Sequence, residues 1–380
     1  MNNLDGEWEQ FLNDENFEDF EDINTDVELL NKNNNDDIKI TNFIPKCNDI
    51  YISTKSQIIF LSDEINIFDI FWKLNIINYY EQKEGIIMKQ IKVSCINDEE
   101  IKKTEENINK VENTRIVTLS NSKLNNQKKK YKKTIKITIG YCSKDITSIR
   151  TKDKKAFYNC LVLILRLKIE NYFKEMHVKI FNTGKIEIPG IQNDWILNKI
   201  LEKIIEYLKP FNNNIFWKPE TLQTILINSN FSCNFHINRE KLKNIIKYKN
   251  GLSVSYDPCS YPGIQCKFYN NINNKKNDGI CYCIKKNNDN NDNKEENLDL
   301  VKRKTKCSCI SVSFMIFRTG NVLIVGHCTT EILIKVYDYI KNILETHYEE
   351  IKDDTKIVSK KKNNNKKIRK KTIHISPIIS

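Results

Sequence analysis

A ten-residue pattern that occurs twice is the feature that most constrains this chain. The first copy is FNTGKIEIPG, Phe181–Gly190, and the second is FRTGNVLIVG, Phe317–Gly326. Both read F-x-T-G, then five residues, then Gly, and each follows a β-rich run and precedes an amphipathic segment. A strand–turn–strand–helix unit that recurs in this way indicates an internal duplication.

Alternation within each copy places its phenylalanine. Side chains on a strand point alternately to its two faces. Phe181 therefore shares a face with His177 and Lys179, and Phe317 shares a face with Ser311, Ser313 and Met315. Each phenylalanine ends the more polar face of its strand. A ring folded over the end of a hairpin would explain one copy, but two copies at matched positions favour a function.

The formal net charge of +12 suits a polyanionic partner. The chain is also rich in Asn, Ile and Lys, as an AT-rich genome would encode, so part of the lysine excess reflects codon usage. We expect no membrane span and no signal peptide, because no long apolar run is present. Without a secretory signal, the twelve cysteines suggest reduced thiols or a metal site and not a disulfide framework.

Both ends of the chain read as tails. Residues 1–37 are acidic, with interspersed Trp8, Phe11, Phe17 and Phe20, and we expect either a disordered segment that folds on a partner or a solvated tail. Residues 351–380 form a basic tail that binds nucleic acid, serves as an address or is merely solvated. For the basic loop at 127–133, solvation is the favoured reading.

Between the tails, the pattern predicts alternating strands and helices. We expect an N-terminal helical extension over 38–85, with a buried helix at 65–80. Strands are predicted at 86–96, 134–142 and from Ala156, followed by the first hairpin and a helix over about 194–208. The second half is predicted to contain a strand from Leu222, a short helix, two strands, an inserted loop, the second hairpin and a helix carrying Ile332, Val336, Ile340 and Leu344.

Three motifs of the second half occur together in one known family. SYDPCSYPGIQCKFY resembles "Y-E-P-E-L-F-P-G-L", FRTGNVLIVG resembles "F-x-S-G-K-x-x-x-T-G", and INSNFSCNF resembles a strand with "N-I-V-G-S-C-D". The first half repeats them more loosely through KQIKVSCIND, KKAFYNCLVLIL and FNTGKIEIPG. The chain thus resembles the TATA-box-binding protein family, most like the divergent members of nucleocytoplasmic large DNA viruses. Repeat 1 would span 86–210 with an insertion at about 111–134, and repeat 2 would span 220–350 with an insertion at about 270–306.

The resemblance implies an α+β fold: two pseudo-symmetric repeats form one curved, saddle-like antiparallel sheet with helices on the convex face. The concave face of the family sits on the DNA minor groove, where two pairs of aromatic wedges kink the duplex. Carried onto this chain, the wedges are Phe157 with Phe181 and Tyr261 with Phe317. An amide in the first strand of each repeat reads the groove, which matches Asn228 and places Gln90 in the first half. The same resemblance assigns DNA contacts to Lys185, Leu323, Val325 and Lys267.

Two departures from the family pattern affect the expected DNA-binding face. Glu187 and Pro189 stand where the family usually has a β-branched apolar residue and a threonine, and a carboxylate facing phosphates is unfavourable. Asn321 replaces the usual lysine. High affinity for a TATA sequence is therefore not implied, and the basic loop or tail would have to supply charge.

Cysteines flank the second insertion. Cys281 and Cys283 precede it, and Cys307 and Cys309 follow it. On strands, two such pairs could close a tetrahedral thiolate zinc site, although the usual structural spacing is C-x2-C. Zinc and free thiols both remain open. Cys95, Cys142, Cys160 and Cys233 lie in apolar strands and are predicted to be core residues.

We therefore expect a transcription initiation factor that bends AT-rich promoter DNA and seats RNA polymerase and a TFIIB-like factor. The alternative is a saddle-fold scaffold that works through proteins alone. No enzyme is expected, because the five histidines are scattered and no glycine-rich phosphate loop is present. The viral resemblance implies an intracellular protein of a viral factory in the cytoplasm, or of the nucleus or virion.

Overall fold

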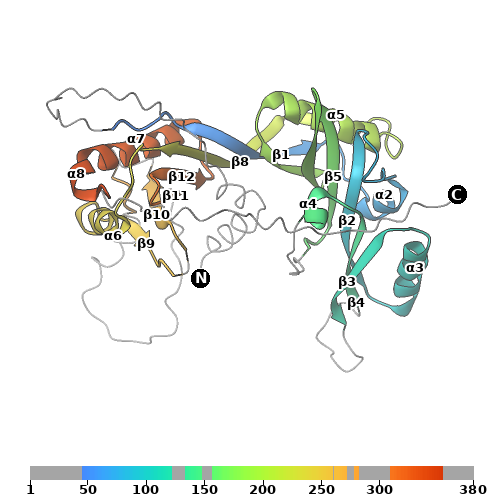
Figure 1. The fold of residues 1–380 in the computed structure, drawn as a ribbon. Helices are drawn as coiled ribbons and strands as arrows, with labels where there is room; N and C mark the ends of the chain where they lie inside the picture. Colours follow the sequence, from blue (N-terminus) through green and yellow to red (C-terminus); the bar gives the residue numbers. More distant parts are fainter. Residues whose placement is uncertain are drawn as a thin grey trace, which may run out of the picture. The chain divides into compact units, whose positions relative to one another are not determined.

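The computed structural model describes residues 45–121, 133–147, 156–259, 261–271, 278–281 and 309–353. These residues belong to one compact unit, which extends from Pro45. Its strands form a single twelve-stranded sheet in the order β3-β4-β2-β5-β6-β7-β1-β8-β12-β11-β10-β9 (Figure 1). Neighbouring strands throughout this order are antiparallel. The predicted α+β class with one continuous antiparallel sheet is confirmed.

The strands and helices are as follows. The strands are β1 (Tyr51–Leu61), β2 (Gly85–Cys95), β3 (Thr114–Asn121), β4 (Lys133–Gly140), β5 (Cys160–Ile169), β6 (Tyr172–Phe181), β7 (Lys185–Ile191), β8 (Trp217–Ser232), β9 (Ser253–Ser255), β10 (Ile264–Asn270), β11 (Ile310–Ile316) and β12 (Asn321–Gly326). The helices are α2 (Ile67–Lys73), α3 (Asp98–Asn109), α4 (Ser143–Thr147), α5 (Asp194–Leu208), α6 (Arg239–Asn244), the π-helical turn η2 (Ile245–Lys249), α7 (Thr330–Thr346) and α8 (Tyr348–Ile351).

The two halves meet where β1 pairs with β8 in the centre of the sheet. On one side of this pair, β1 is followed by β7, β6, β5 and β2; on the other side, β8 is followed by β12, β11, β10 and β9. β1 with α2 thus corresponds to β8 with α6. Both of these helices begin at an asparagine, Asn66 or Asn238, whose side chain accepts hydrogen bonds from the first turn.

The repeated glycines have the same backbone role in both halves. Gly184 and Gly320 have φ values of +78° and +85°, in the left-handed region that glycine adopts without strain. The Gly184 carbonyl accepts a hydrogen bond from Leu61 N at 2.9 Å, and the Gly320 carbonyl accepts one from Cys233 N at 3.0 Å. A Cβ at either glycine would lie within 2.6 Å of a neighbouring carbonyl oxygen. The turn therefore tolerates no other residue without movement.

The expected helical extension at 38–85 is wrong for the part that the structure describes. Within these residues, β1 is a central strand, and only α2 (Ile67–Lys73) forms a helix where a longer one was predicted at 65–80. β1 was missed because only its last third has a regular buried alternation, through Ile59 and Leu61. The first strand of repeat 1 is therefore β1, and β2 takes the place of a second strand.

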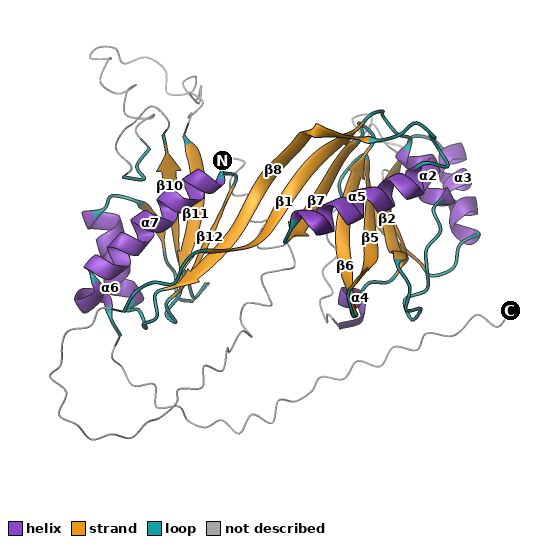
Figure 2. Ribbon diagram, turned by 90° about the horizontal axis from the view of Figure 1, so that it is seen from above, coloured by secondary structure: helices purple, strands orange, loops and turns teal. Residues whose placement is uncertain are grey.

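Apolar side chains of both halves pack on one face of the sheet. α5 and α7 lie across this face, one on each half (Figure 2). Each of these helices buries seven side chains, and burying a Leu or Ile stabilises the fold by about 1.5–3 kcal/mol. The predicted bounds of α5 and the four predicted core residues of α7 are confirmed. The four cysteines expected in the core are all buried, as predicted.

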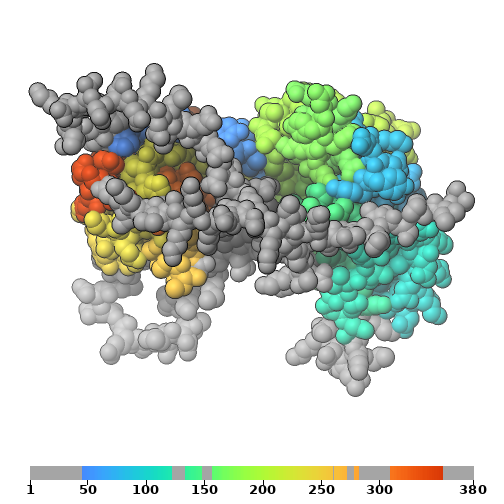
Figure 3. Space-filling model, in the orientation of Figure 1, coloured from blue at the N-terminus to red at the C-terminus, as the bar shows by residue number. Residues whose placement is uncertain are grey.

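An additional block stands between β2 and β5. It contains α3, the hairpin β3–β4 and α4, and it continues the sheet beyond β2. The insertion predicted at about 111–134 covers only part of this block. In Figure 3 the teal residues of α3, β3 and β4 lie beside the blue residues of α2 and β2.

Several predicted features lie outside the described residues: the acidic segment at 1–37, most of the basic loop at 127–133, Cys283, Cys307 and most of the basic tail at 351–380. Among the helices that the structure does describe, none has both the length and the apolar character needed to cross a membrane.

Candidate nucleic-acid interface

The sheet face opposite α5 and α7 carries most of the predicted site residues; we call it the open face. In the second half, the strand register aligns Lys267, Ser313, Val325 and Asn228 in one row across β10, β11, β12 and β8. The neighbouring row is Gln265, Met315, Leu323 and Asn230. Residues paired across antiparallel strands share a face. The structure thus brings together four of the predicted contacts, Asn228, Lys267, Leu323 and Val325.

Tyr261 and Phe317 form an aromatic pair at one end of the open face. Their ring centroids lie 6.1 Å apart at an interplanar angle of 61°, an edge-to-face arrangement. Gly263 lies against both rings, and a Cβ there would approach Tyr261 to 3.0 Å and Phe317 to 3.1 Å. The glycine of the YPG motif therefore leaves room for the two rings. Both aromatic side chains are half-buried.

Phe157 and Phe181 occupy the corresponding region of the first half. Phe157 precedes β5 and is 48% exposed, whereas Phe181 ends β6 and is half-buried. Each ring contacts a lysine: Lys179 Nζ lies 5.0 Å from the Phe157 centroid, and Lys185 Nζ lies 5.2 Å from the Phe181 centroid. Cation–π attraction of this kind holds a ring and a charge together. The first pair of aromatics is thus bordered by lysines.

Glu187, which is unfavourable if it faces phosphate alone, has a partner. Lys179 Nζ donates a hydrogen bond to Glu187 Oε1 at 2.7 Å, and the two side chains are only 6% and 14% exposed. Lys185 Nζ lies 4.0 Å from the other carboxylate oxygen. The carboxylate is therefore neutralised within the sheet face. Sequence reasoning missed Lys179 as its partner, although the alternation already placed Lys179 and Phe181 on one face.

The predicted pair of amides is not symmetric. Asn228 lies on β8, is buried, and its Oδ1 has no hydrogen-bond partner among the described residues. Gln90 lies on β2, four strands from the centre, where its Oε1 is 3.5 Å from Thr138 Oγ1. The placement of Gln90 near the pseudo-dyad was wrong because the first strand is β1. Ser56 of β1 stands at the position that matches Asn228, as their pairings with Leu226 and Thr54 indicate.

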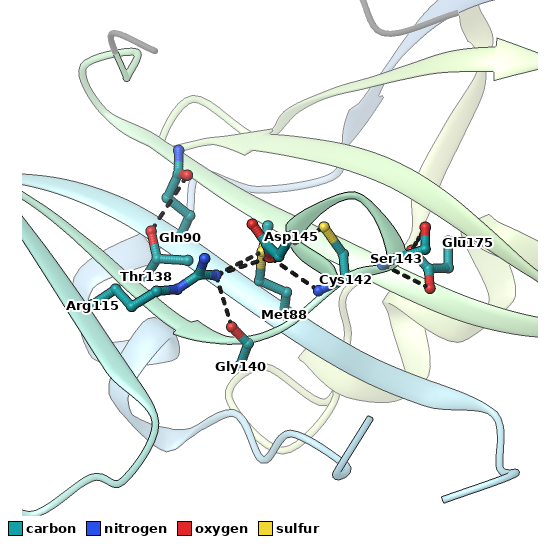
Figure 4. A network of polar contacts seen from close by, with 9 residues as sticks. All are labelled: Met88, Gln90, Arg115, Thr138, Gly140, Cys142, Ser143, Asp145 and Glu175. Carbon is teal, nitrogen blue, oxygen red and sulfur yellow. Dashed lines mark hydrogen bonds and ion pairs between the residues drawn. The ribbon is translucent and has the colours of Figure 1, made fainter. Parts of the chain in front are cut away.

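A polar network fastens α4 to the outer part of the open face (Figure 4). Arg115 of β3 donates hydrogen bonds to Asp145 Oδ2 and to the Gly140 carbonyl, both at 2.9 Å. The backbone N–H of Ser143 donates to both carboxylate oxygens of Glu175 on β6, at 3.2 and 3.0 Å. This network ties the inserted block to β6. It was not visible in the sequence, because its members are far apart along the chain.

Burial and charge tune the groups of this network. Burial opposes the charged form of Asp145, but the hydrogen bond from Arg115 outweighs it and holds the pKa of Asp145 below its ordinary value. Burial, reinforced by the Asp145 carboxylate, raises the pKa of the Cys142 thiol to about 12. Burial likewise raises the pKa of Cys160, beneath the first aromatic pair, to about 12. These thiols are therefore neutral and unreactive at pH 7.

The cysteines that flank the second insertion are partly described. Cys281 Sγ and Cys309 Sγ lie 3.8 Å apart, too far for a disulfide bond of about 2.05 Å. Sulfurs that share a tetrahedral zinc with bonds of about 2.3 Å would lie at nearly this separation. Cys283 and Cys307 lie outside the described residues, and no group of three metal ligands is found within the residues that are described.

Comparison with known proteins gives one relative and one solved structure. No family model matches the chain. A protein named "TATA-box-binding protein-like", from Acanthamoeba polyphaga mimivirus, is 24% identical over 226 residues, which cover 55% of this chain and 54% of the relative. The chain thus spans about half the length of that relative.

The structure of Methanococcus jannaschii TBP aligns at a TM-score of 0.37 with 13% identity, over 79% of this chain and 99% of the archaeal chain. The viral match, on which the comparison rests, agrees with the motifs of both repeats. The resemblance to the TATA-box-binding protein family, and to its divergent viral members, that these motifs indicate is confirmed.

Proposed function

We propose that this chain is a TBP-like transcription initiation factor that binds AT-rich promoter DNA through the minor groove and bends it. The observation that carries the proposal is the Tyr261–Phe317 pair, seated over Gly263 at the end of the open face. Half-buried rings in such a place can enter a base step. Unstacking costs a few kcal/mol per step, which the contacts of a bent duplex offset.

The rows between the aromatic pairs suit the minor groove. Leu323 and Val325 are apolar, Asn228 offers amide donors, and an A·T groove presents acceptors only. Lys185 and Lys267, both half-buried, would meet the phosphates. RNA polymerase and a TFIIB-like factor are the protein partners that the family resemblance proposes, and a viral factory is the site of action that it proposes.

The alternative is a scaffold that contacts proteins without DNA. The Lys179–Glu187 pair favours it, because a neutral ion pair in the face gives no attraction to phosphate. Gel-shift and end-to-end fluorescence transfer on AT-rich duplexes of about 40 base pairs separate the two proposals. A bend with sub-micromolar affinity supports the DNA-binding factor. Neither binding nor bending at 50 mM salt would leave the scaffold.

We further propose that Cys281, Cys283, Cys307 and Cys309 bind a structural zinc ion. The separation of 3.8 Å between the sulfurs of Cys281 and Cys309 supports this site. Thiolates are zinc's preferred structural ligands, and such a site would close the base of the second insertion.

A further inference from the structure

The inserted hairpin places two lysines opposite each other. Lys92 of β2 pairs directly with Lys136 of β4 in the antiparallel register. Lys92 is two residues from Gln90, and Lys136 is two residues from Thr138, so both lie on the open face together with the Gln90–Thr138 contact. Like charges directly opposite on a sheet are destabilising, with cross-strand pair energies of roughly 0.2–1 kcal/mol. An anion bound between them would remove this cost.

The two lysines stand next to an exposed aromatic. Tyr158 is 56% exposed, and its ring centroid lies 3.2 Å from Lys92 Nζ. Its neighbour Phe157 is one of the proposed wedges and contacts Lys179. Two consecutive aromatics, each against a lysine, therefore lead from the wedge towards the inserted hairpin. DNA kinked at Phe157 and Phe181 would continue past Tyr158.

The geometry points to a DNA-backbone site made by Lys92, Lys136 and Tyr158, which extends the first half's contact beyond the kink. This inference rests on the proposed function. The ligand is the phosphate–sugar backbone, because two ammonium groups and a phenol recognise phosphate without reading bases. In the described part of the second half, the sheet ends beyond β10 with the three-residue strand β9, and no matching pair of lysines lies there. The footprint is therefore longer on the side of the first half.

The test compares two variants of equal charge in the full-length chain. Lys92→Gln with Lys136→Gln removes the proposed site. Lys102→Gln with Lys103→Gln removes two exposed lysines of α3, a helix that packs on the other face through Ile108. The probe is a 40-base-pair AT-rich duplex, measured by gel shift at several salt concentrations and by hydroxyl-radical footprinting.

The open-face variant should lower the slope of log K against log salt by about 1–2, since each phosphate contact contributes about 0.9. Affinity should fall about tenfold, the footprint should shorten at one end, and the bend should stay unchanged. Its melting temperature should not fall, because a like-charge pair has been removed. Equal slopes and footprints for the parent and both variants would overturn the inference.

The outcome for the proposed function is read separately. If the parent binds DNA without bending it, and the open-face variant still lowers the salt slope, the backbone site stands and the wedge mechanism fails. If the parent bends DNA and the open-face variant behaves like the α3 variant, the proposed function stands and the backbone site fails.

Discussion

The two halves use different chemistry at one matched place on the open face. In the second half, Met315 and Leu323 pair between β11 and β12. In the first half, the same positions of β6 and β7 hold Lys179 and Glu187, joined at 2.7 Å. An apolar pair can contact a groove directly, whereas a buried ion pair mainly satisfies itself. The second half therefore carries more of the proposed minor-groove contact, and the first half carries more charge around it.

The inserted blocks sharpen the contrast. In the first half, Met88 and Ile164 form a small buried cluster with Cys142, against which Tyr79 packs, so part of the open face is covered. In the second half, Ser313 and Lys267 occupy the matching row. We expect the protein to bind DNA asymmetrically for this reason.

The largest effect should follow from breaking the ion pair. Glu187→Leu leaves Lys179 buried without its carboxylate, which should cost about 3–5 kcal/mol of unfolding free energy. Lys179→Met with Glu187→Leu copies the second half and should be close to neutral or stabilising. Urea unfolding measures all three proteins, and Lys185→Met, with its long contact to Glu187, is the control. A single variant as stable as the parent would contradict this account.

The aromatic pairs come next. Phe317→Ala should cost about 2–3 kcal/mol of DNA affinity and reduce the bend, because stacking is worth about 1–3 kcal/mol per base. Phe181→Ala should cost about 1 kcal/mol, since Lys185 lies against its ring and has to be displaced before a base can stack. Gel shift and end-to-end fluorescence transfer measure both quantities. Equal losses would remove the distinction between the halves, and unchanged bending in both would end the intercalation mechanism.

The second insertion depends on metal in our proposal. Cys281→Ser with Cys309→Ser should abolish stoichiometric zinc and lower the melting temperature by a few degrees, at about 2–4 °C per kcal/mol for a protein of this size. Cys259→Ser, at an exposed cysteine, should retain zinc. Elemental analysis of purified protein decides the matter. Metal-free parent protein of full stability would rule the site out.

The first insertion should respond to acid instead. Because folding lowers the pKa of Asp145, this carboxylate contributes stability above its unfolded pKa of about 3.9 and loses it as the pH falls through the folded value. Asp145→Asn should lower the melting temperature by about 2–4 °C at pH 7, with a gap that closes below about pH 4. Glu170→Gln, at an exposed turn residue, should show no such gap. A gap of equal size at pH 7 and pH 3 would exclude the Arg115–Asp145 pair as its cause.

The sequence was sufficient for elements with a strong local signal. The two F-x-T-G turns, α5 and α7 could be predicted because glycine conformation and helical periodicity are local properties. β1 could not, because its place in the sheet depends on partners in β7 and β8 far along the chain. The misplacement of Gln90 followed from that error.

The same limit applies to the site. Parity along one strand placed Phe181 and Phe317 on the polar face, and the strand register agrees with it. The Lys179–Glu187 pair depends on the register between β6 and β7, and the Arg115–Asp145 pair depends on the fold of an insertion. No spacing in the sequence reports either contact.

The central place of β1 has a consequence for how the chain folds during synthesis. β1 is made early, but its neighbour β8 is made about 170 residues later. At about 5–20 residues per second, a ribosome needs roughly 10–30 s to supply that partner. Pairings of such high contact order form late. The nascent chain therefore carries an unpaired strand through most of its translation, and closing the sheet centre should be its slow folding step.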